Sequence, residues 1–286
     1  MRPGFMRWLM LVVSLHHCVA YAGRRKAFNR ELRRFLANNV TTSQRSLVVV
    51  GAHLFHLDHN DPLAAMVRKI PWGAVLLIEA SPLLAGQLSS AIAAKNPFWG
   101  VPRERVFVAN VGVIPEDMVA TGQNGEQTLP FSTLNVTAGS GLPDWATQAG
   151  SFHAAHVWSK VREIAEQSGG MWTRKQLQKK LLVTHVPCRT LQAELRHQTE
   201  LHHLPPPGAV LIDTEALDCR IVEREDFCTA ALHPELLVYE YTHCTERARA
   251  AARTRLSHCP GFGSPAFQDS ENIYFTTTWL NSPKSA

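Results

Sequence analysis

The sequence predicts an α/β fold with a mostly parallel sheet and helices on both faces. Residues 47–50, 74–78 and 209–212 are short, wholly apolar runs, which is typical of strands buried on both faces of a parallel sheet. Amphipathic helical segments separate these runs, as crossovers between parallel strands require. The last apolar run, residues 273–279, alternates with polar threonines. This alternation predicts an antiparallel strand at or near the sheet edge.

The first half of the expected domain reads as strand, loop, helix and strand. The strand at 46–50 is followed at once by Gly51 and Ala52, where the chain can turn tightly and approach a ligand. Asp61-Pro62 and Ser81-Pro82 each predict the start of a helix, because Asp and Ser cap helices and Pro suits the first helical position. A third strand is expected at residues 105–111.

The second half begins with a segment that lacks periodicity. Residues 114–150 are rich in Gly, Pro, Thr and Asn, and we expect a long loop or lid there. The following elements are expected in chain order: a helical segment at 151–182, a strand at 181–187, a helix at 190–197, strands at 209–212 and 235–241, and a helix at 248–256. No linker divides the chain, so residues 46–286 are expected to form one domain.

The N-terminus has the pattern of a secretory signal over residues 1–22. Arg2 and Arg7 precede an apolar core, and Ala20-Tyr21-Ala22 fits a small-residue cleavage site. The alternative is an uncleaved anchor, but the apolar run is short for a span, which needs about 20 residues. No later stretch of the sequence is long and apolar enough to cross a bilayer. We therefore expect a protein of the secretory lumen, or a secreted one. Residues 23–45 are expected to form an N-terminal helix.

Charge and cysteine content narrow the class further. Without Arg2 and Arg7 of the signal, 27 basic residues stand against 24 acidic ones, and this net charge of +3 is too mild and too dispersed to favour nucleic acid. Outside the signal, the cysteines are odd in number, so at least one is free or bonds another chain, while one or two bridges are expected. These cysteines are Cys188, Cys219, Cys228, Cys244 and Cys259. The chain has no Cys-x-x-Cys pair, which argues against a structural zinc site. Asn39 and Asn135 begin sequons for glycosylation.

The order of the motifs resembles the FkbM-type methyltransferases. VVVGAH resembles the family's first strand and Gly-Ala turn, and WGAVLLIEASP its second strand and acid. VLIDTEALDCRIV resembles its Asp-Val-Glu-Gly signature. The resemblance implies a Rossmann-like class I methyltransferase fold for residues 46–286, with S-adenosylmethionine as cofactor. Several positions depart from the family pattern: Val49, His53, Phe55, Ala216 and Asp218.

The resemblance also implies a set of cofactor-binding residues at the carboxyl ends of the first three strands. Glu79 follows the second strand, where a carboxylate can accept hydrogen bonds from ribose hydroxyls. Asn110 is expected on the adenine side. The full expected set is Gly51, Ala52, His53, Asp61, Glu79, Asn110 and Val111.

Asp213 and Glu215 follow the apolar strand at 209–212 and are the expected catalytic pair. Asp213 is the candidate general base, and two close carboxylates raise the pKa of one of them, which suits a base. The pair could also hold a divalent cation through its oxygens, or Glu215 could serve as a helix cap. No metal ligand set is predicted. His53, His56 and His59 match no metal motif, and His185, His233 and His243 are weaker candidates.

These expectations favour a methyltransferase that modifies a hydroxyl of a glycan or another small molecule in the secretory pathway. Two alternatives stay open. One is a binding protein that keeps the fold without catalysis, as the departures at Val49, Phe55 and Ala216 suggest. The other is a lumenal glycosyltransferase that uses Asp213 and Glu215 to hold a metal and a sugar nucleotide.

Overall fold

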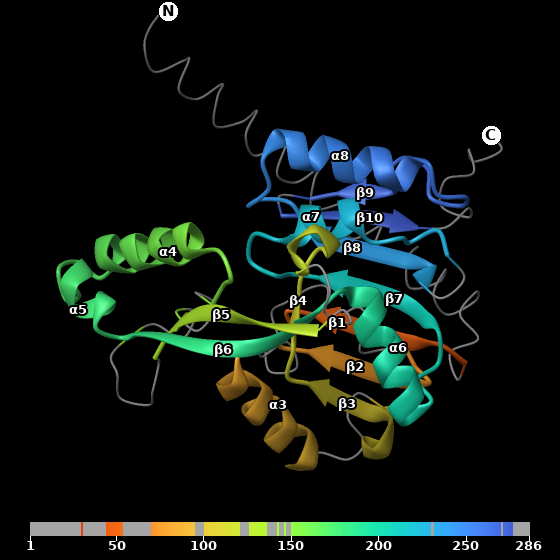
Figure 1. The fold of residues 1–286 in the computed structure, drawn as a ribbon, viewed down its shortest axis with the longest axis horizontal. Helices are drawn as coiled ribbons and strands as arrows, with labels where there is room; N and C mark the ends of the chain where they lie inside the picture. Colours follow the sequence, from red (N-terminus) through yellow and green to blue (C-terminus); the bar gives the residue numbers. More distant parts are fainter. Residues whose placement is uncertain are drawn as a thin grey trace, which may run out of the picture.

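The computed structural model describes residues 30, 44–53, 70–94, 100–120, 126–135, 142, 146, 150–229, 232–269 and 271–276. Within these residues, seven strands form one sheet in the order β3-β2-β1-β7-β8-β10-β9 (Figure 1). Their bounds are β1 Ser46–Val50, β2 Ala74–Ile78, β3 Val106–Ala109, β7 Pro207–Ile212, β8 Leu236–Glu240, β9 Phe267–Gln268 and β10 Asn272–Thr276. The signal segment and the helix expected at Asp61-Pro62 lie outside the described residues.

The sheet is parallel except at its C-terminal side. β1 pairs in parallel with β2 and with β7, and β7 pairs in parallel with β8. β10 runs antiparallel to both β8 and β9. The expected α/β class, the mostly parallel sheet and the antiparallel last strand are therefore confirmed.

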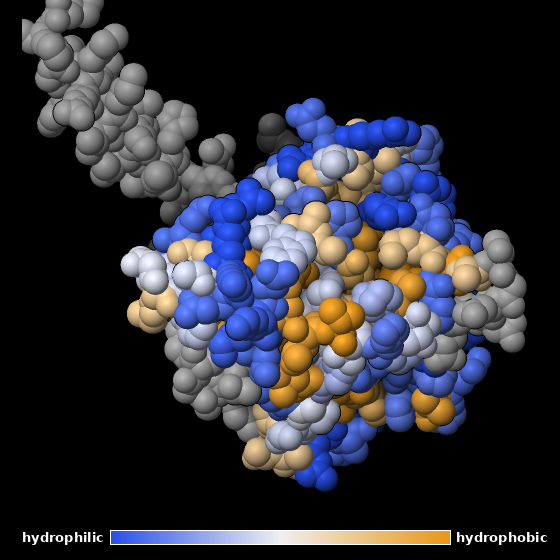
Figure 2. All heavy atoms as spheres, turned by 60° about the vertical axis from the view of Figure 1, so that its left-hand side comes forward, coloured by the Kyte–Doolittle hydropathy of each residue, from blue (hydrophilic) through white to orange (hydrophobic). Residues whose placement is uncertain are grey.

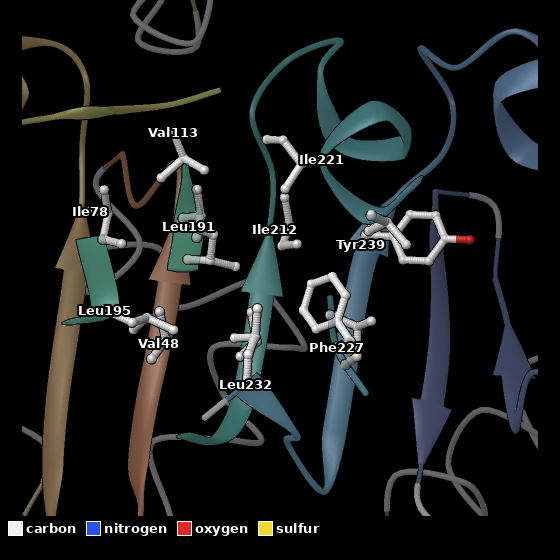
Figure 3. Packing of buried hydrophobic residues seen from close by; sticks show 14 of the residues in the cluster. Val48, Ile78, Val113, Leu191, Leu195, Ile212, Ile221, Phe227, Leu232 and Tyr239 are labelled. Carbon is white, nitrogen blue, oxygen red and sulfur yellow. The ribbon is translucent and has the colours of Figure 1, made fainter. Parts of the chain in front are cut away.

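Alternate residues of the central strands enter two separate cores, one on each face of the sheet. On one face Val48, Ile78 and Ile212 pack with helix residues, among them Leu191 and Ile221 (Figure 3). On the other face the intervening strand residues, such as Val49 and Leu77, pack with Leu88 and Ile92 of another helix. Every residue of β1, β2 and β7 is buried, which explains why these strands read as unbroken apolar runs.

Four helices in the described part of the chain flank the large sheet. They are α3 Pro82–Ala94, α6 Leu191–His202, α7 Asp218–Arg224 and α8 Glu246–Ser257. Ser81 Oγ accepts a hydrogen bond from Leu84 N, so the expected Ser81-Pro82 start of α3 is confirmed. Thr190 and Thr245 cap α6 and α8 in the same way.

A second, smaller unit projects from the large sheet, at the left of Figure 1. We call it the lobe. It contains a three-stranded sheet in the order β4-β6-β5, with the helices α4 and α5. The bounds are β4 Gly112–Val113, β5 Glu126–Leu134, β6 Leu181–Arg189, α4 Ala154–Gln167 and α5 Arg174–Gln178.

The lobe corrects two sequence expectations. The segment expected as a loop at 114–150 contains β5, a nine-residue strand that pairs antiparallel with β6 along its whole length. The helical segment expected at 151–182 is broken, because Gly169 and Gly170 both have positive φ values between α4 and α5. Figure 2 turns the lobe forward and shows hydrophobic side chains in the middle of this face, with hydrophilic surface around them.

Two disulfides hold the α7 and α8 side of the fold. Cys219 bonds Cys244, and Cys228 bonds Cys259. Cys188 is buried and free. The odd thiol and the two bridges in the C-terminal half are therefore confirmed. In the described residues, no helix has the length and apolar character needed to span a membrane.

Candidate functional site

A cavity of about 320 Å³ opens at the carboxyl ends of the central strands of the large sheet. Ligands of open α/β sheets bind at this edge, outside the strand ends. The strand ends supply one wall of the cavity, and the lobe supplies the opposite wall. Residues from both walls include Gly51, Glu79, Val111, Phe152, Glu215 and His243.

Gly51 makes the turn after β1, and only glycine fits there. Its φ is +73°, and a Cβ atom at this position would lie 1.6 Å from the carbonyl oxygen of Asp213. The amides of Gly51 and Ala52 both donate to the Ile78 carbonyl at 2.9 Å, which locks the turn onto β2. Gly51 lines the cavity as expected, whereas Ala52 is 1% exposed and packs into the core.

Glu79 is a buried carboxyl at the end of β2. Its two oxygens accept hydrogen bonds from the amides of His53 and Ser81, each at 2.7 Å. Burial raises its pKa to about 7, against the lowering effect of these two hydrogen bonds. Glu79 and His53 both line the cavity, so Glu79 can share the remaining lone pairs of its oxygens with a ligand.

The other expected cofactor residues take different places. Val111 is buried and lines the cavity. Asn110 donates from Nδ2 to the carbonyls of Glu79 and Ala80, at 2.9 and 3.0 Å. It therefore fixes the turn after β2. Asp61 lies outside the described residues, as do Phe55, His56 and His59.

Asp213 and Glu215 follow β7 and both line the cavity, as the sequence predicts. Their environments differ. Asp213 is exposed, whereas Glu215 is partly buried beside two histidines. Glu215 Oε2 lies 2.9 Å from His156 Nε2 and 3.6 Å from His243 Nε2. Burial raises the pKa of Glu215, but its contact with His156 and the nearby positive groups outweigh burial, and the net pKa is lowered.

Glu215 is therefore not a member of the pair with a raised pKa. Asp218, three residues further on, has a pKa raised to about 7, because its carboxyl is buried and lies near Glu240. Asp218 accepts hydrogen bonds from the amides of Thr214 and Ala216, at 2.8 and 3.3 Å. It holds the turn in which Glu215 and Ala216 have φ values of 52° and 100°.

Sequence reasoning missed His156 as a site residue. It lies in the first turn of α4 in the lobe, and nothing in the local sequence marks it as a ligand. His243 was only a weak candidate, although it follows β8, the neighbour of β7, and so lies near Glu215. Ser151 Oγ also donates to the Glu215 carbonyl at 2.8 Å, which ties the lobe to this turn.

The lobe wall of the cavity contains two aromatic rings. Phe131 and Phe152 meet edge to face with centroids 4.9 Å apart. Gly112 and Gly150 make room for them, since a Cβ atom at either position would lie less than 3 Å from a ring carbon of Phe152 or Phe131. This wall can pack against an apolar or ring-shaped part of a ligand.

The charges around the cavity are mostly acidic. The carboxyl groups that line it belong to Glu79, Asp213, Glu215, Glu240 and Glu271. Lys160 is the only lysine or arginine among the described lining residues. Such a lining favours a ligand with positive charge.

No family model matches the chain, and no match was found among the curated proteins. The function of the cavity must therefore be argued from its residues and from the position that it occupies in the fold.

Proposed function

We propose that the protein is an S-adenosylmethionine-dependent methyltransferase that methylates a hydroxyl of a sugar or another small acceptor in the secretory pathway. One observation carries the proposal. A cavity at the carboxyl ends of β1 and β2 has Gly51 at its floor and the buried carboxyl of Glu79 beside it. This is the place where open α/β sheets bind a nucleoside, with an acid after the second strand on the ribose.

The topology of the large sheet supports this reading. Numbered along the chain, its first five strands follow the order 3-2-1-4-5 of doubly wound nucleotide-binding sheets. The chain then departs from that pattern, because β10 inserts antiparallel between β8 and β9. An antiparallel C-terminal strand is the feature that the class I methyltransferase resemblance predicts.

The acidic lining supports the same cofactor. S-adenosylmethionine carries a sulfonium and an ammonium against one carboxylate, so its net charge is positive. The carboxylates of Asp213, Glu215 and Glu240 line the cavity and favour such a ligand over an anionic one. The same lining disfavours a sugar nucleotide unless a metal ion neutralises its phosphates.

Bound S-adenosylmethionine supplies an already activated methyl group. The chain therefore has to bind this cofactor, align the acceptor hydroxyl with the methyl group and remove the proton of that hydroxyl. Gly51 and Glu79 would hold the nucleoside end. The rings of Phe131 and Phe152 would hold the acceptor from the lobe side. Asp213, exposed at the cavity, would accept the proton that the acceptor hydroxyl loses.

The first test is calorimetric titration of the full chain with S-adenosylhomocysteine. Glu79 and Glu225 offer a matched pair, since each is a buried carboxyl with a pKa of about 7 that accepts two backbone hydrogen bonds. Only Glu79 lines the cavity. We expect Glu79→Gln to abolish binding and Glu225→Gln to leave it intact. Absence of binding by the folded wild-type protein would overturn the proposal.

Two further assays separate the alternatives. If S-adenosylhomocysteine binds but no extract of glycans or small molecules is methylated, the protein is a catalytically inactive binding protein. If Asp213→Ala abolishes methyl transfer, the inactive reading fails. Binding of a sugar nucleotide that requires Mg²⁺ or Mn²⁺, with no response to S-adenosylhomocysteine, would instead assign a glycosyltransferase. The two disulfides support a site of action in an oxidising compartment.

A further inference from the structure

Three potential metal ligands from distant parts of the chain meet at the edge of the cavity. His156 comes from α4 of the lobe, Glu215 from the turn after β7, and His243 from the segment after β8. One ligand atom of each lies within 4.8 Å of the others. The two measured contacts are 2.9 Å, from Glu215 Oε2 to His156 Nε2, and 3.6 Å, from Glu215 Oε2 to His243 Nε2.

The two closest atoms of this cluster are buried and contact each other. His156 Nε2 and Glu215 Oε2 lie 2.9 Å apart, and neither makes a hydrogen bond to a third group in the described part of the chain. The His156 side chain is only 5% exposed. With no third partner, both atoms can turn to an ion that binds among the three ligands, because the contact that they would lose is only the one with each other.

The spacing is close to what a tetrahedral ion requires. Zn²⁺ binds His nitrogen and carboxylate oxygen at about 2.0–2.1 Å, which places neighbouring ligand atoms about 3.3 Å apart. The two measured contacts lie on either side of this value. Since all three ligand atoms already lie within 4.8 Å of one another, shifts of these side chains would bring them to bonding distance from one ion.

The donor types favour a transition metal. Two imidazoles and one carboxylate suit Zn²⁺ and other divalent transition ions, whereas Mg²⁺ and Ca²⁺ prefer sets made of oxygen. Sites with three protein ligands keep a fourth position open for water or substrate. Glu215 and His243 line the cavity, so that fourth position would face it.

We propose that His156, Glu215 and His243 form a binding site for a divalent transition-metal ion of the Zn²⁺ class, with its open position directed into the cavity. The site joins the lobe to the large sheet, since one ligand comes from α4 and two follow strands of the sheet. The ion would occupy the acceptor end of the cavity, away from Glu79.

One consequence rests on the proposed methyltransferase activity. A metal at this position can bind the acceptor hydroxyl and lower its pKa, so that its proton is lost more easily to a carboxylate such as Asp213. The metal site itself does not depend on that activity, because its three ligands are not the residues, Gly51 and Glu79, that are proposed to hold the nucleoside of the cofactor.

The experiment measures Zn²⁺ binding to the full chain, made with its disulfides and freed of metal by a chelator. Equilibrium dialysis with metal analysis gives stoichiometry and affinity, and thermal unfolding with and without ZnCl₂ gives a second readout. We expect one tightly bound ion per chain, little competition from Mg²⁺, and a higher melting temperature with ZnCl₂.

The variants His243→Ala and Glu215→Gln are expected to weaken Zn²⁺ binding by at least about 100-fold, since loss of even an indirect partner costs 10- to 100-fold. His197→Ala on α6 is the control and is expected to bind as the wild type does. His243 is partly exposed, so its replacement leaves the fold intact. Wild-type protein that binds no Zn²⁺, or variants that bind as tightly as the control, would overturn the proposal.

The outcome is separable from that of the proposed function. Titration with S-adenosylhomocysteine reports on the Gly51 and Glu79 end of the cavity and needs no metal. A chain that binds Zn²⁺ but not S-adenosylhomocysteine keeps the metal site and loses the methyltransferase. A chain with the opposite behaviour keeps the methyltransferase and loses the metal site.

Discussion

The large sheet and the lobe are built in different ways. Strands β1, β2 and β7 are buried along their whole length and pack into cores on both faces of the sheet. The lobe has a small core of its own, and β6 exposes Leu182 and Val183. We call the large sheet with its flanking helices the scaffold, and the lobe is attached to it. The cavity lies between them and takes residues from both.

The difference between scaffold and lobe also appears in which atoms would collide with a Cβ atom added at a glycine. At Gly51, in the scaffold, a Cβ atom would collide with backbone, whereas at Gly112, in the lobe, it would collide with the movable ring of Phe152. Backbone of a buried sheet cannot shift without moving its neighbours, but a ring can rotate or slide. The scaffold therefore tolerates less change than the lobe.

The largest expected effect tests this contrast directly. Gly51→Ala should cost about 4 kcal/mol or more, because it adds a backbone collision to a strained positive φ. Gly112→Ala should cost about 1–3 kcal/mol, the usual range for overpacking. Urea unfolding measures both. Gly86→Ala in α3 has open space around it and should gain about 0.5–1 kcal/mol. Equal losses at Gly51 and Gly112 would contradict the contrast.

The next effect concerns the disulfides, which lie only on the scaffold side. Each closes a loop with a sequence separation of 25 or 31 residues, and loss of either should cost about 3 kcal/mol. The loops overlap in sequence, so the losses should not add. We expect the paired change Cys219→Ser with Cys244→Ser to speed proteolysis around α7 and α8. Cleavage within the lobe should stay unchanged, and faster cleavage there would show that the two regions unfold together.

The pH dependence of stability should also come mainly from the scaffold. Glu79, Asp218 and Glu225 are buried carboxyls with pKa values raised to about 7 from 4.5 or below. Between those values the folded chain holds more protons than the unfolded chain, so stability falls as pH rises from about 4 to 7 and then levels off.

Each of these carboxyls contributes on the order of 3 kcal/mol to that fall. Urea unfolding between pH 4.5 and 8 measures it. Glu225→Gln removes one titrating group while keeping an acceptor for the Leu191 amide, so its curve should be flatter than that of the wild type. A wild-type curve that rises toward pH 7 would contradict the assignment.

The last expected effect is a gain in stability. Ala216 has a φ of 100°, a conformation that favours glycine, and the resemblance places glycine at this position. Ala216→Gly should stabilise the chain by about 1 kcal/mol, because relief of strain exceeds the added chain entropy. Ala250→Gly on α8 is the control and should lose about 1 kcal/mol. A loss of stability on Ala216→Gly would show that the positive φ of Ala216 causes no strain.

The sequence predicts the scaffold well because its signals are local. An apolar run such as residues 74–78 is sufficient to identify a buried strand, and Ser81-Pro82 is sufficient to identify a helix start. The position of Gly51 and Glu79 at the cavity follows from the rule for strand ends. In these cases the burial or the cap that stabilises an element is determined by the residues of that element itself.

Strand β5 of the lobe and the histidine cluster were not predicted, because their signals are not local. β5 contains Pro130 and lies among glycines, both unusual in a strand, and its conformation is set by pairing with β6. His156 becomes a potential ligand only when α4 docks beside the turn of Glu215. No periodicity or spacing encodes that contact.

Cys188, the free thiol beside the two disulfides, is protected from exchange with them by its surroundings. Cys188 is fully buried, its Sγ donates to the Val186 carbonyl at 3.2 Å, and burial raises its pKa to about 11. At neutral pH only about one molecule in ten thousand would carry the reactive thiolate, and that thiolate is shielded. The native chain thus cannot reshuffle its own bridges. A mispaired Cys188 would therefore be a chemical record that the molecule had once unfolded.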